Sequence, residues 1–274
     1  MLVAALRDAA AAEIMPRFRA LAAEDIDTKS GPTDLVTLAD IRAEAQITTQ
    51  IEQLWPEAAV YGEEAVAGDA RLRAKMGGAA GGTGPVVIID PVDGTWNFAK
   101  GLSLFGVLLA VARGGVPEYG LLYDPVIDDW IEASLGAPSQ MITAAGAIKP
   151  VHTSKVSAPR AMTGYVPLSL YRRAGWPKMM ETFREFGRVH SLRCSCHEYR
   201  MLAQGQVEFI LSGPVPHPWD HAAGALAVEG AGGVVRFLDG ASYDTGRING
   251  VLLAAGSQAA WDLVAERFAY LAQD

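Results

Sequence analysis

Two aspartates, Asp90 and Asp93, stand three residues apart directly after the apolar run Val86–Ile89. Two like charges this close are unfavourable unless a cation compensates them. Carboxylate oxygens, with no histidine or cysteine nearby in the sequence, are typical ligands of magnesium. The spacing by itself favours a simpler interpretation, in which Asp90 ends a surface strand and Asp93 caps a helix, and only the longer sequence context favours a metal centre.

Gly94 and Thr95 follow the acidic pair at once. Glycine lets a ligand approach the backbone closely. A helix that begins at Thr95 would direct free N–H groups and the positive end of its dipole at an anion. The sequence therefore predicts that a metal and a phosphate share one turn.

Several predicted elements must position this turn. Apolar spacing predicts amphipathic helices over Met1–Ala23 and Leu35–Leu54, and short apolar runs predict strands at Val60–Glu64 and Val86–Asp90. Glycine and proline breaks then delimit an antiparallel meander. Its predicted strands are Leu104–Ala112, Tyr119–Tyr123 and Trp130–Ser134.

The second half of the chain alternates strand and helix patterns, which indicates an α/β layer. We expect a mixed α/β fold of two closely packed subdomains. Residues 1–140 would form an α+β subdomain with most of the metal ligands, and residues 141–274 an α/β subdomain. The seam is expected near Leu135–Lys149, where Gly, Ala and Pro interrupt the pattern.

Composition narrows the function classes. The chain has 274 residues, 50% of them hydrophobic and 20% charged, which excludes a disordered protein. Two cysteines are too few for a disulfide scaffold, and we expect both to be reduced. A net charge of −8 disfavours binding to nucleic acid or anionic lipid. Apolar runs are too short to span a bilayer, and the first residues do not resemble a secretory signal, so we expect a cytoplasmic protein.

The string DPVDGTWNF at residues 90–98 resembles the first signature of the inositol monophosphatase family of metal-dependent phosphatases. Three further strings resemble motifs of that family, in the same order. They are DLVTLAD at 34–40, GEE at 62–64, and WDHAAG at 219–224 followed by EGAGG at 229–233. This resemblance implies the layered α-β-α-β-α fold of sugar phosphatases.

The resemblance also implies a set of metal ligands for two to three Mg²⁺ ions. Glu63, Asp90 and the carbonyl of Val92 would hold the first ion. Asp90, Asp93 and Asp220 would hold the second, and a third, weaker ion would bind near Glu63. The ions would position the phosphate, neutralise charge and lower the pKa of the attacking water. Lithium inhibition and homodimerisation are further expectations from the family.

Catalytic roles are implied for Glu63, Thr95 and Asp40. Glu63 and the Thr95 hydroxyl would orient the water, and Asp40 would accept a hydrogen bond from Thr95 and help to remove the proton. The amides of Gly94 and Thr95 would hold phosphate oxygens. Water would attack directly, without a phosphoenzyme.

Two residues near these motifs leave alternatives open. Lys29, in the predicted loop 28–32, matches a family lysine close to the site but can equally be a solvated loop lysine. Glu64 stands beside Glu63, and adjacent residues on a strand face opposite ways. We therefore expect only Glu63 to face the metals.

Substrate contacts are expected from Arg193, Ser195, Glu198 and Asp220. Here the chain departs from the family pattern, because Arg193-Cys-Ser-Cys-His-Glu198 replaces the usual Gly-Ser/Thr-Ala turn. A neutral Gly213 also stands where many members have a glutamate. Glu198 could replace that glutamate, and Arg193 could favour a second anionic group.

The predicted reaction is hydrolysis of a small phosphate monoester, of the inositol phosphate type. The run Cys194-x-Cys196-x-x-Tyr199 faintly resembles the corresponding turn of histidinol phosphatases, which makes histidinol phosphate an alternative substrate. Arg193 suits a bisphosphate such as fructose 1,6-bisphosphate or 3′-phosphoadenosine 5′-phosphate. A regulatory binding protein is the alternative from another class.

Two other patterns have no catalytic interpretation. Cys194, Cys196, His190 and His197 lack the spacing of a zinc site. The glycine-rich stretch 77–84 lacks a phosphate-binding loop motif and is expected to be a surface loop.

Overall fold

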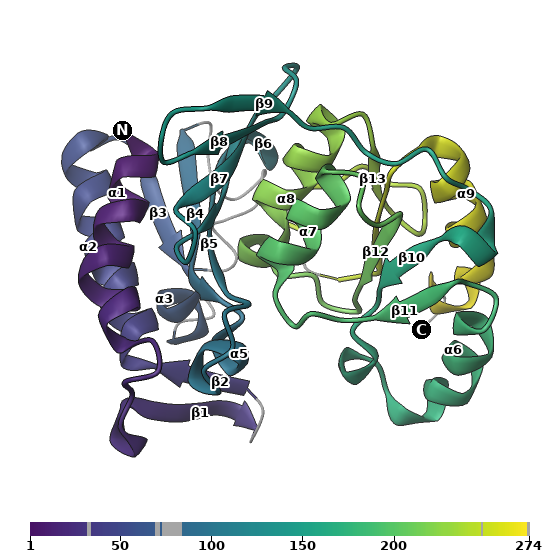
Figure 1. The fold of residues 1–274 in the computed structure, drawn as a ribbon, viewed down its shortest axis with the longest axis horizontal. Helices are drawn as coiled ribbons and strands as arrows, with labels where there is room; N and C mark the ends of the chain where they lie inside the picture. Colours follow the sequence, from purple (N-terminus) through teal and green to yellow (C-terminus); the bar gives the residue numbers. More distant parts are fainter. Residues whose placement is uncertain (32–33, 69–71, 73–83, 248, 273–274) are drawn as a thin grey trace.

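The structure is a computed structural model that describes residues 1–272 apart from 32–33, 69–71, 73–83 and 248. Two β-sheets lie face to face with helices between them, and further helices cover both outer faces (Figure 1). The predicted layered fold is thereby confirmed. The glycine-rich stretch 77–84 lies outside the described residues, except for Gly84.

The larger sheet has seven strands in the order β3-β4-β5-β6-β7-β8-β9. Their bounds are β3 Ala59–Gly62, β4 Pro85–Asp93, β5 Gly106–Arg113, β6 Val116–Asp124, β7 Asp129–Ser134, β8 Gln140–Thr143 and β9 Ile148–Pro150. Strands β3 and β4 run parallel, and every later pair is antiparallel. The predicted meander forms its centre.

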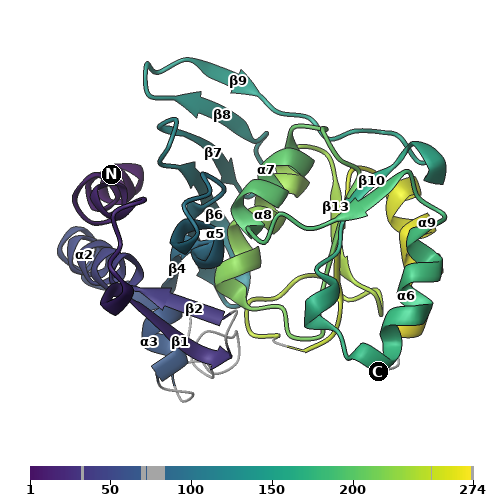
Figure 2. The same ribbon diagram turned by 60° about the horizontal axis from the view of Figure 1, so that its bottom comes forward.

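The smaller sheet has five strands in the order β11-β10-β12-β14-β13. Their bounds are β10 Thr163–Tyr165, β11 Arg188–His190, β12 Phe209–Ser212, β13 Val234–Phe237 and β14 Leu252–Ala255. A separate hairpin of β1 (Ile26–Gly31) and β2 (Asp34–Thr37) lies below the larger sheet and contacts α5 (Thr95–Ala99) through β2 (Figure 2).

Six of the other helices in the described part of the chain pack in three pairs. Helices α1 (Leu2–Ala9) and α2 (Leu38–Leu54) cover the outer face of the larger sheet. Helices α7 (Ser195–Ala203) and α8 (Pro218–Gly230) lie between the sheets, and α6 (Trp176–Phe183) and α9 (Gln258–Arg267) cover the smaller sheet (Figure 1). The short α3 (Glu63–Gly68) follows β3. None of the helices within the described ranges is both long and apolar enough to cross a bilayer.

Strand β4 is buried along its whole length because both of its faces are covered. Val87 and Ile89 pack into the core formed with α1 and α2, while Val86 and Ile88 pack into the core formed with α7 and α8. The two-residue alternation of a strand thus explains the continuous apolar run. The strand ends, with Asp90 and Asp93, between the two cores.

Helix α8 fits between two sheets because glycines at its contacts let neighbouring elements approach closely. A Cβ placed on Gly120 of β6 would lie 3.0 Å from the Cα of Ala223. A Cβ on Gly224 would lie 2.2 Å from the ring of Tyr199 on α7. The close packing of α8 against β6 and α7 fixes the position of its first turn, which carries Asp220.

Several predicted boundaries are wrong. The first helical segment ends at Arg17 instead of Ala23, after a π-helical turn that ends at Ile14 and a 3₁₀ turn that begins at Met15. Residues 35–37, predicted as helix, are the end of β2, and Thr37 caps α2. The predicted loop 28–32 is strand β1 over residues 28–31. Tertiary pairing of β1 with β2 overrides the local pattern.

The stretch Leu135–Lys149 contains a hairpin that the sequence does not predict. Strands β8 and β9 extend the larger sheet through this stretch, which was expected to be the seam between two subdomains. The division of the chain at residue 140 stays a prediction.

Candidate active site

Asp90 and Asp93 stand at the end of β4, where the strand stops pairing regularly with β5. The register shifts between these two residues, so the backbone bulges there. Both side chains are buried, at 2% and 7% exposed. The bulge therefore directs two carboxylates into the same region instead of to opposite faces of a strand.

Gly94 makes the turn from β4 into α5. Its φ of +88° lies in the left-handed region, which disfavours other residues. A Cβ there would also lie 2.8 Å from the carbonyl oxygen of Leu104. Helix α5 begins at Thr95, as the sequence predicts.

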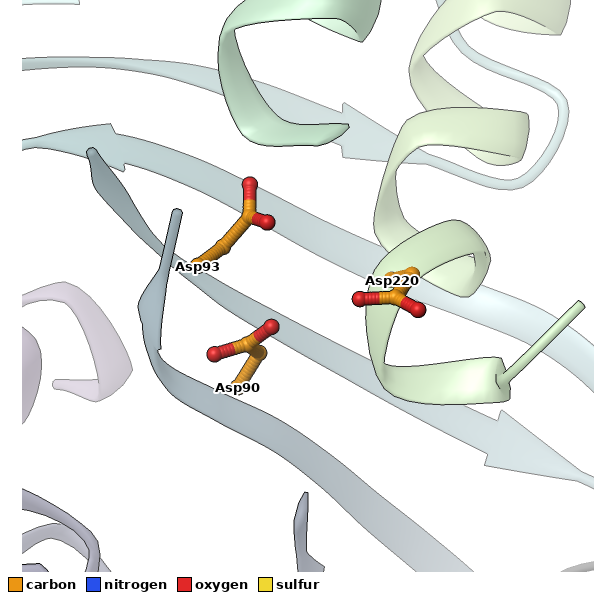
Figure 3. Close-up of side chains that lie close together, drawn as sticks. All are labelled: Asp90, Asp93 and Asp220. Carbon is orange, nitrogen blue, oxygen red and sulfur yellow. The ribbon is translucent and has the colours of Figure 1, made fainter. Parts of the chain in front are cut away.

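Asp220 reaches the same region from the first turn of α8. Asp90, Asp93 and Asp220 each offer a carboxylate oxygen within 4.8 Å of the others (Figure 3). The first two side chains are buried and the third is half-buried. Three carboxylates separated by up to 130 positions in the sequence thus converge on one small volume.

This cluster fits a divalent cation. Burial, followed by the charges of Glu63 and the neighbouring aspartates, raises the pKa of Asp90 and of Asp220 well above the usual range of a carboxyl. Burial also raises the pKa of Asp93. Such groups are costly as bare anions and are stabilised by a hard cation that takes oxygen ligands.

Asp93 is fixed by the start of α7 and by the residue that precedes this helix. Its Oδ2 accepts hydrogen bonds from the backbone N–H of Cys196 and from the thiol of Cys194, whose sulfur is 3.1 Å away. Both cysteines are buried and unpaired by a disulfide, as expected. The Cys194 sulfur thus contacts a carboxylate, whereas the Cys196 sulfur lies 3.7 Å from the carbonyl oxygen of Tyr123.

Thr95 and Asp40 are hydrogen bonded. The Thr95 hydroxyl lies 3.0 Å from Asp40 Oδ1 and 3.0 Å from the carbonyl oxygen of Val92, so its single proton is shared between two acceptors. Burial raises the pKa of Asp40 to about 6, against hydrogen bonds from Thr37 and Thr95 that favour the anion. A carboxyl with this pKa can accept a proton near neutral pH.

Glu63 and Glu64 both reach Lys29, which lies on β1. The lysine Nζ is 2.7 Å from Glu63 Oε1 and 2.6 Å from Glu64 Oε1. The expectation that only one of these glutamates faces the site is wrong in its premise, because they begin helix α3 and do not lie on a strand. Lys29 is therefore part of the site and not a solvated loop residue.

The charges of this trio are coupled. Burial opposes the charge of Lys29, but the two glutamates outweigh it and raise the lysine pKa. Burial and the neighbouring Glu63 raise the pKa of Glu64 to about 8.

A cavity of about 1110 Å³ opens beside the cluster, and it is lined by Asp93, Asp220 and Glu63 together with the predicted substrate contacts Arg193, Ser195 and Glu198. The lining does not include Asp40, Asp90, Gly94 and Thr95, nor Val92, which is buried. The structure therefore places some of the predicted metal ligands and substrate contacts around one cavity, whereas the others are not part of its lining.

Glu198 is more a support of the cavity wall than an open acceptor. The side chain is 5% exposed, and its Oε1 accepts hydrogen bonds from the Ser191 hydroxyl and the Leu192 N–H, at 2.9 and 2.7 Å. Burial raises its pKa to about 7. Gly213, in contrast, does not line the cavity, although its neighbour Ser212 does.

Two positioning residues are absent from the sequence-based predictions. Glu44 of α2 accepts the N–H groups of Glu64 and Ala65, both at 2.8 Å, and so caps α3. Asn97 donates to the carbonyl oxygens of Leu104 and Leu192, both at 2.8 Å. The place of Asn97 in the string DPVDGTWNF could have indicated a role at the site, whereas no local sequence pattern indicates one for Glu44.

The histidines near the second motif have packing contacts. His217 stacks on Trp219, with ring centroids 4.6 Å apart. His221 contacts the Tyr199 hydroxyl at 3.1 Å, and burial lowers its pKa to about 3. His221 is therefore neutral at physiological pH.

A family model described as "Inositol monophosphatase family" matches residues 1–271. A histidinol-phosphatase of Streptomyces coelicolor is 31% identical over 90% of this chain and 92% of its own length. The Nus factor SuhB of Vibrio cholerae is 30% identical over 79% of this chain and 77% of its own. A solved structure of an IMPase from Thermotoga maritima superposes with a TM-score of 0.79 at 21% identity, and covers 99% of this chain and 96% of its own.

Proposed function

Because the chain belongs to the inositol monophosphatase family, whose members are phosphatases that hydrolyse phosphate monoesters, we propose that it releases phosphate from a small phosphorylated metabolite with magnesium as its cofactor. The observation that carries this proposal is the convergence of Asp90, Asp93 and Asp220 beside a cavity.

The charge of the cavity supports a cation-dependent reaction on an anion. Its described lining contains six acidic side chains and two basic ones. A phosphate ester would be repelled from such a surface unless cations bind first. The acidic side chains are Asp34, Glu63, Glu64, Asp93, Glu198 and Asp220.

We assign metal binding to Glu63, Asp90, Asp93 and Asp220, and to the carbonyl of Val92. Magnesium bound there would position the phosphate oxygens, neutralise developing charge and make water more acidic. The proposed number of magnesium ions is two to three for each active site. Lithium inhibition follows from the same resemblance and stays a prediction.

The protein groups would handle the water and its proton. The Thr95 hydroxyl donates to Asp40, which leaves its oxygen able to accept a hydrogen bond from the attacking water. Glu63 would accept the other hydrogen of that water. With a pKa of about 6, Asp40 can then receive a proton through Thr95.

The backbone would orient the phosphate. The N–H groups of Gly94 and Thr95 stand at the turn between β4 and α5, so they would donate to phosphate oxygens. As the resemblance to the family implies, attack by water would be direct, without a phosphoenzyme. Inversion at phosphorus is the expected stereochemical outcome of such a single displacement.

A panel of phosphate esters tests the proposal. Phosphate release would be measured with inositol 1-phosphate, histidinol phosphate, fructose 1,6-bisphosphate and 3′-phosphoadenosine 5′-phosphate, with and without magnesium. We expect magnesium-dependent release from at least one of them. Release that is unaffected by a chelator, or none from any ester by folded protein with magnesium bound, would contradict the proposal.

Histidinol phosphate is the second candidate substrate. The Streptomyces coelicolor histidinol-phosphatase aligns over 90% of this chain, including the turn before α7. A preference for histidinol phosphate over the other three esters would select this candidate.

A further inference from the structure

The turn that joins β11 to α7 holds Arg193 in an unusual backbone conformation. Its φ of +56° lies in the left-handed region, which costs a residue with a side chain about 1 kcal/mol or more. Its N–H donates to the Ser191 hydroxyl at 3.0 Å, and its carbonyl oxygen is 3.4 Å from Asn97 Nδ2. Surrounding contacts thus fix the strained residue in place.

The rest of the turn is equally constrained. Glu198 accepts from the Ser191 hydroxyl and the Leu192 N–H, and Asn97 donates to the Leu192 carbonyl at 2.8 Å. One of these anchors comes from α7 and the other from α5. Backbone strain that is over-determined in this way is characteristic of functional sites.

The Arg193 side chain lies over Trp96 on α5. The guanidinium carbon is 4.2 Å from the centroid of the Trp96 ring. A guanidinium attracted to the face of an aromatic ring has its N–H donors in its own plane. Arg193 is exposed and lines the cavity, so those donors lie within reach of a bound ligand.

The other basic residue of the described cavity lining has a different role. Lys29 forms ion pairs with Glu63 and Glu64 beside the predicted metal site. Arg193 is presented by another element and lies beside Trp96, the residue after Thr95. A ligand whose scissile phosphate lies at Gly94 and Thr95 would have the Arg193 side chain nearby, because that side chain lies over the next residue, Trp96.

We propose that Arg193, stacked on Trp96, binds a second phosphate group of the substrate, so that the preferred substrate is a small metabolite with two phosphates. This inference rests on the proposed phosphatase activity. A planar guanidinium can bind such a group through two parallel hydrogen bonds. The rigid turn lowers the entropic cost of presenting it.

The test compares matched substrate pairs that share one scissile ester. The pairs are fructose 1,6-bisphosphate with fructose 1-phosphate, and 3′-phosphoadenosine 5′-phosphate with adenosine 3′-phosphate. For at least one pair, we expect the kcat/KM of the bisphosphate to exceed that of its monophosphate about 10-fold or more, as is typical of a charge-assisted hydrogen bond.

Two variants distinguish the effect of the Arg193 guanidinium from the effect of its backbone conformation, and a third is a control. Arg193→Ala and Arg193→Gly both remove the side chain, but glycine also tolerates the left-handed conformation. Both should bring the ratio of the two kcat/KM values close to one. Arg173→Ala is the matched control, because Arg173 also stacks on a tryptophan, Trp176 at 5.3 Å, but does not line the cavity. It should keep the wild-type ratio.

Each contrary outcome has a separate meaning. A ratio near one in the wild type, or a high ratio that survives both Arg193 variants, would overturn the role of Arg193. A structural defect would lower both members of a pair alike and would be reversed by glycine. If no ester is hydrolysed with magnesium, the proposed function itself fails, whereas hydrolysis of monophosphates without preference for bisphosphates overturns only this inference.

Discussion

At the scale of single residues, Asp93 connects the carboxylate cluster to the turn that shapes the cavity. One carboxylate oxygen accepts hydrogen bonds from Cys194 and Cys196, while the residue also belongs to the cluster with Asp90 and Asp220. A substitution at Asp93 that keeps an oxygen acceptor therefore tests metal binding while it preserves the hydrogen bonds that support the fold.

Asp93→Asn should lower turnover by about 100-fold or more, because an amide is a weak ligand for magnesium. Its carbonyl oxygen can still accept from Cys196, so the fold should persist. Phosphate release, magnesium binding by calorimetry and circular dichroism would measure these effects. Asp262→Asn, on the exposed face of α9, is the control. Unchanged turnover in Asp93→Asn would contradict the assignment of Asp93 as a metal ligand, whereas a binding function that persists without turnover would favour the alternative of a regulatory binding protein.

Glu198 should make the metal-free protein less stable as the pH rises. Burial raises its folded-state pKa from 4.5 to about 7, so the folded state holds a proton that the unfolded state releases between these values. Its contribution to stability is complete below about pH 4.5 and declines until about pH 7, by up to about 3 kcal/mol.

Glu198→Gln removes this decline while it keeps an oxygen acceptor for Ser191 and Leu192. We expect the melting temperature of the variant, relative to wild type, to increase between pH 4.5 and 7 in the presence of a chelator. The exposed Glu266→Gln is the control. A difference that is independent of pH would show that Glu198 does not titrate in this range.

At the scale of elements, the position of α3 depends on a contact between α2 and β3. Glu44 of α2 caps α3, and Gly62 leaves the room for it, because a Cβ on Gly62 would lie 2.1 Å from the Glu44 carboxyl carbon. The next residue along the chain is Glu63, so the cap also positions a proposed metal ligand.

Gly62→Ala should displace Glu44, loosen the first turn of α3 and destabilise the protein by about 2 kcal/mol. Turnover should fall as well, because Glu63 moves. Chemical denaturation and phosphate release would measure both effects. Gly175→Ala is the matched control, since nothing lies within 4 Å of a Cβ there. Wild-type stability in Gly62→Ala would refute the role assigned to this contact.

At the scale of the whole molecule, the site joins the two sheets. Asp90 and Asp93 come from the larger sheet, and Asp220 comes from a helix packed between the sheets. Compensation of these like charges should therefore stabilise the fold as a whole.

Magnesium should raise the melting temperature more at pH 7.5 than at pH 5. The raised pKa values of Asp90, Asp93 and Asp220 mean that their ionisation destabilises the metal-free protein as the pH rises, and protons compete with the cation at low pH. Thermal unfolding with magnesium or chelator at both pH values measures this difference. An equal shift at both values would argue against binding at these carboxylates.

Homodimerisation is a prediction from the family. A dimer would remove exposed apolar side chains from water, and candidates on the described surface include Leu102 and Ile148, at 45% and 60% exposed. Light scattering should give twice the 29.1 kDa mass of the chain. A monomer mass at micromolar concentration would contradict it.

The sequence alone determined those parts of the fold and site that depend on neighbouring residues. The meander, the strand that ends at Asp90, the helix start at Thr95 and the four family motifs are local patterns of apolar spacing, turn residues and caps. For the same reason the layered fold and the family were predictable, although the roles of the individual site residues remain predictions.

Only the tertiary structure decided which distant groups meet. Pairing of β1 with β2 brings Lys29 to both glutamates, Glu44 of α2 caps α3, and the turn before α7 places Arg193 on Trp96. Each contact joins segments that are far apart in the chain, and its geometry depends on the packing of whole elements. Local sequence patterns carry no information on such packing, which is why the strand premise for Glu64 was wrong and the contacts of Glu44 and Asn97 were not predicted.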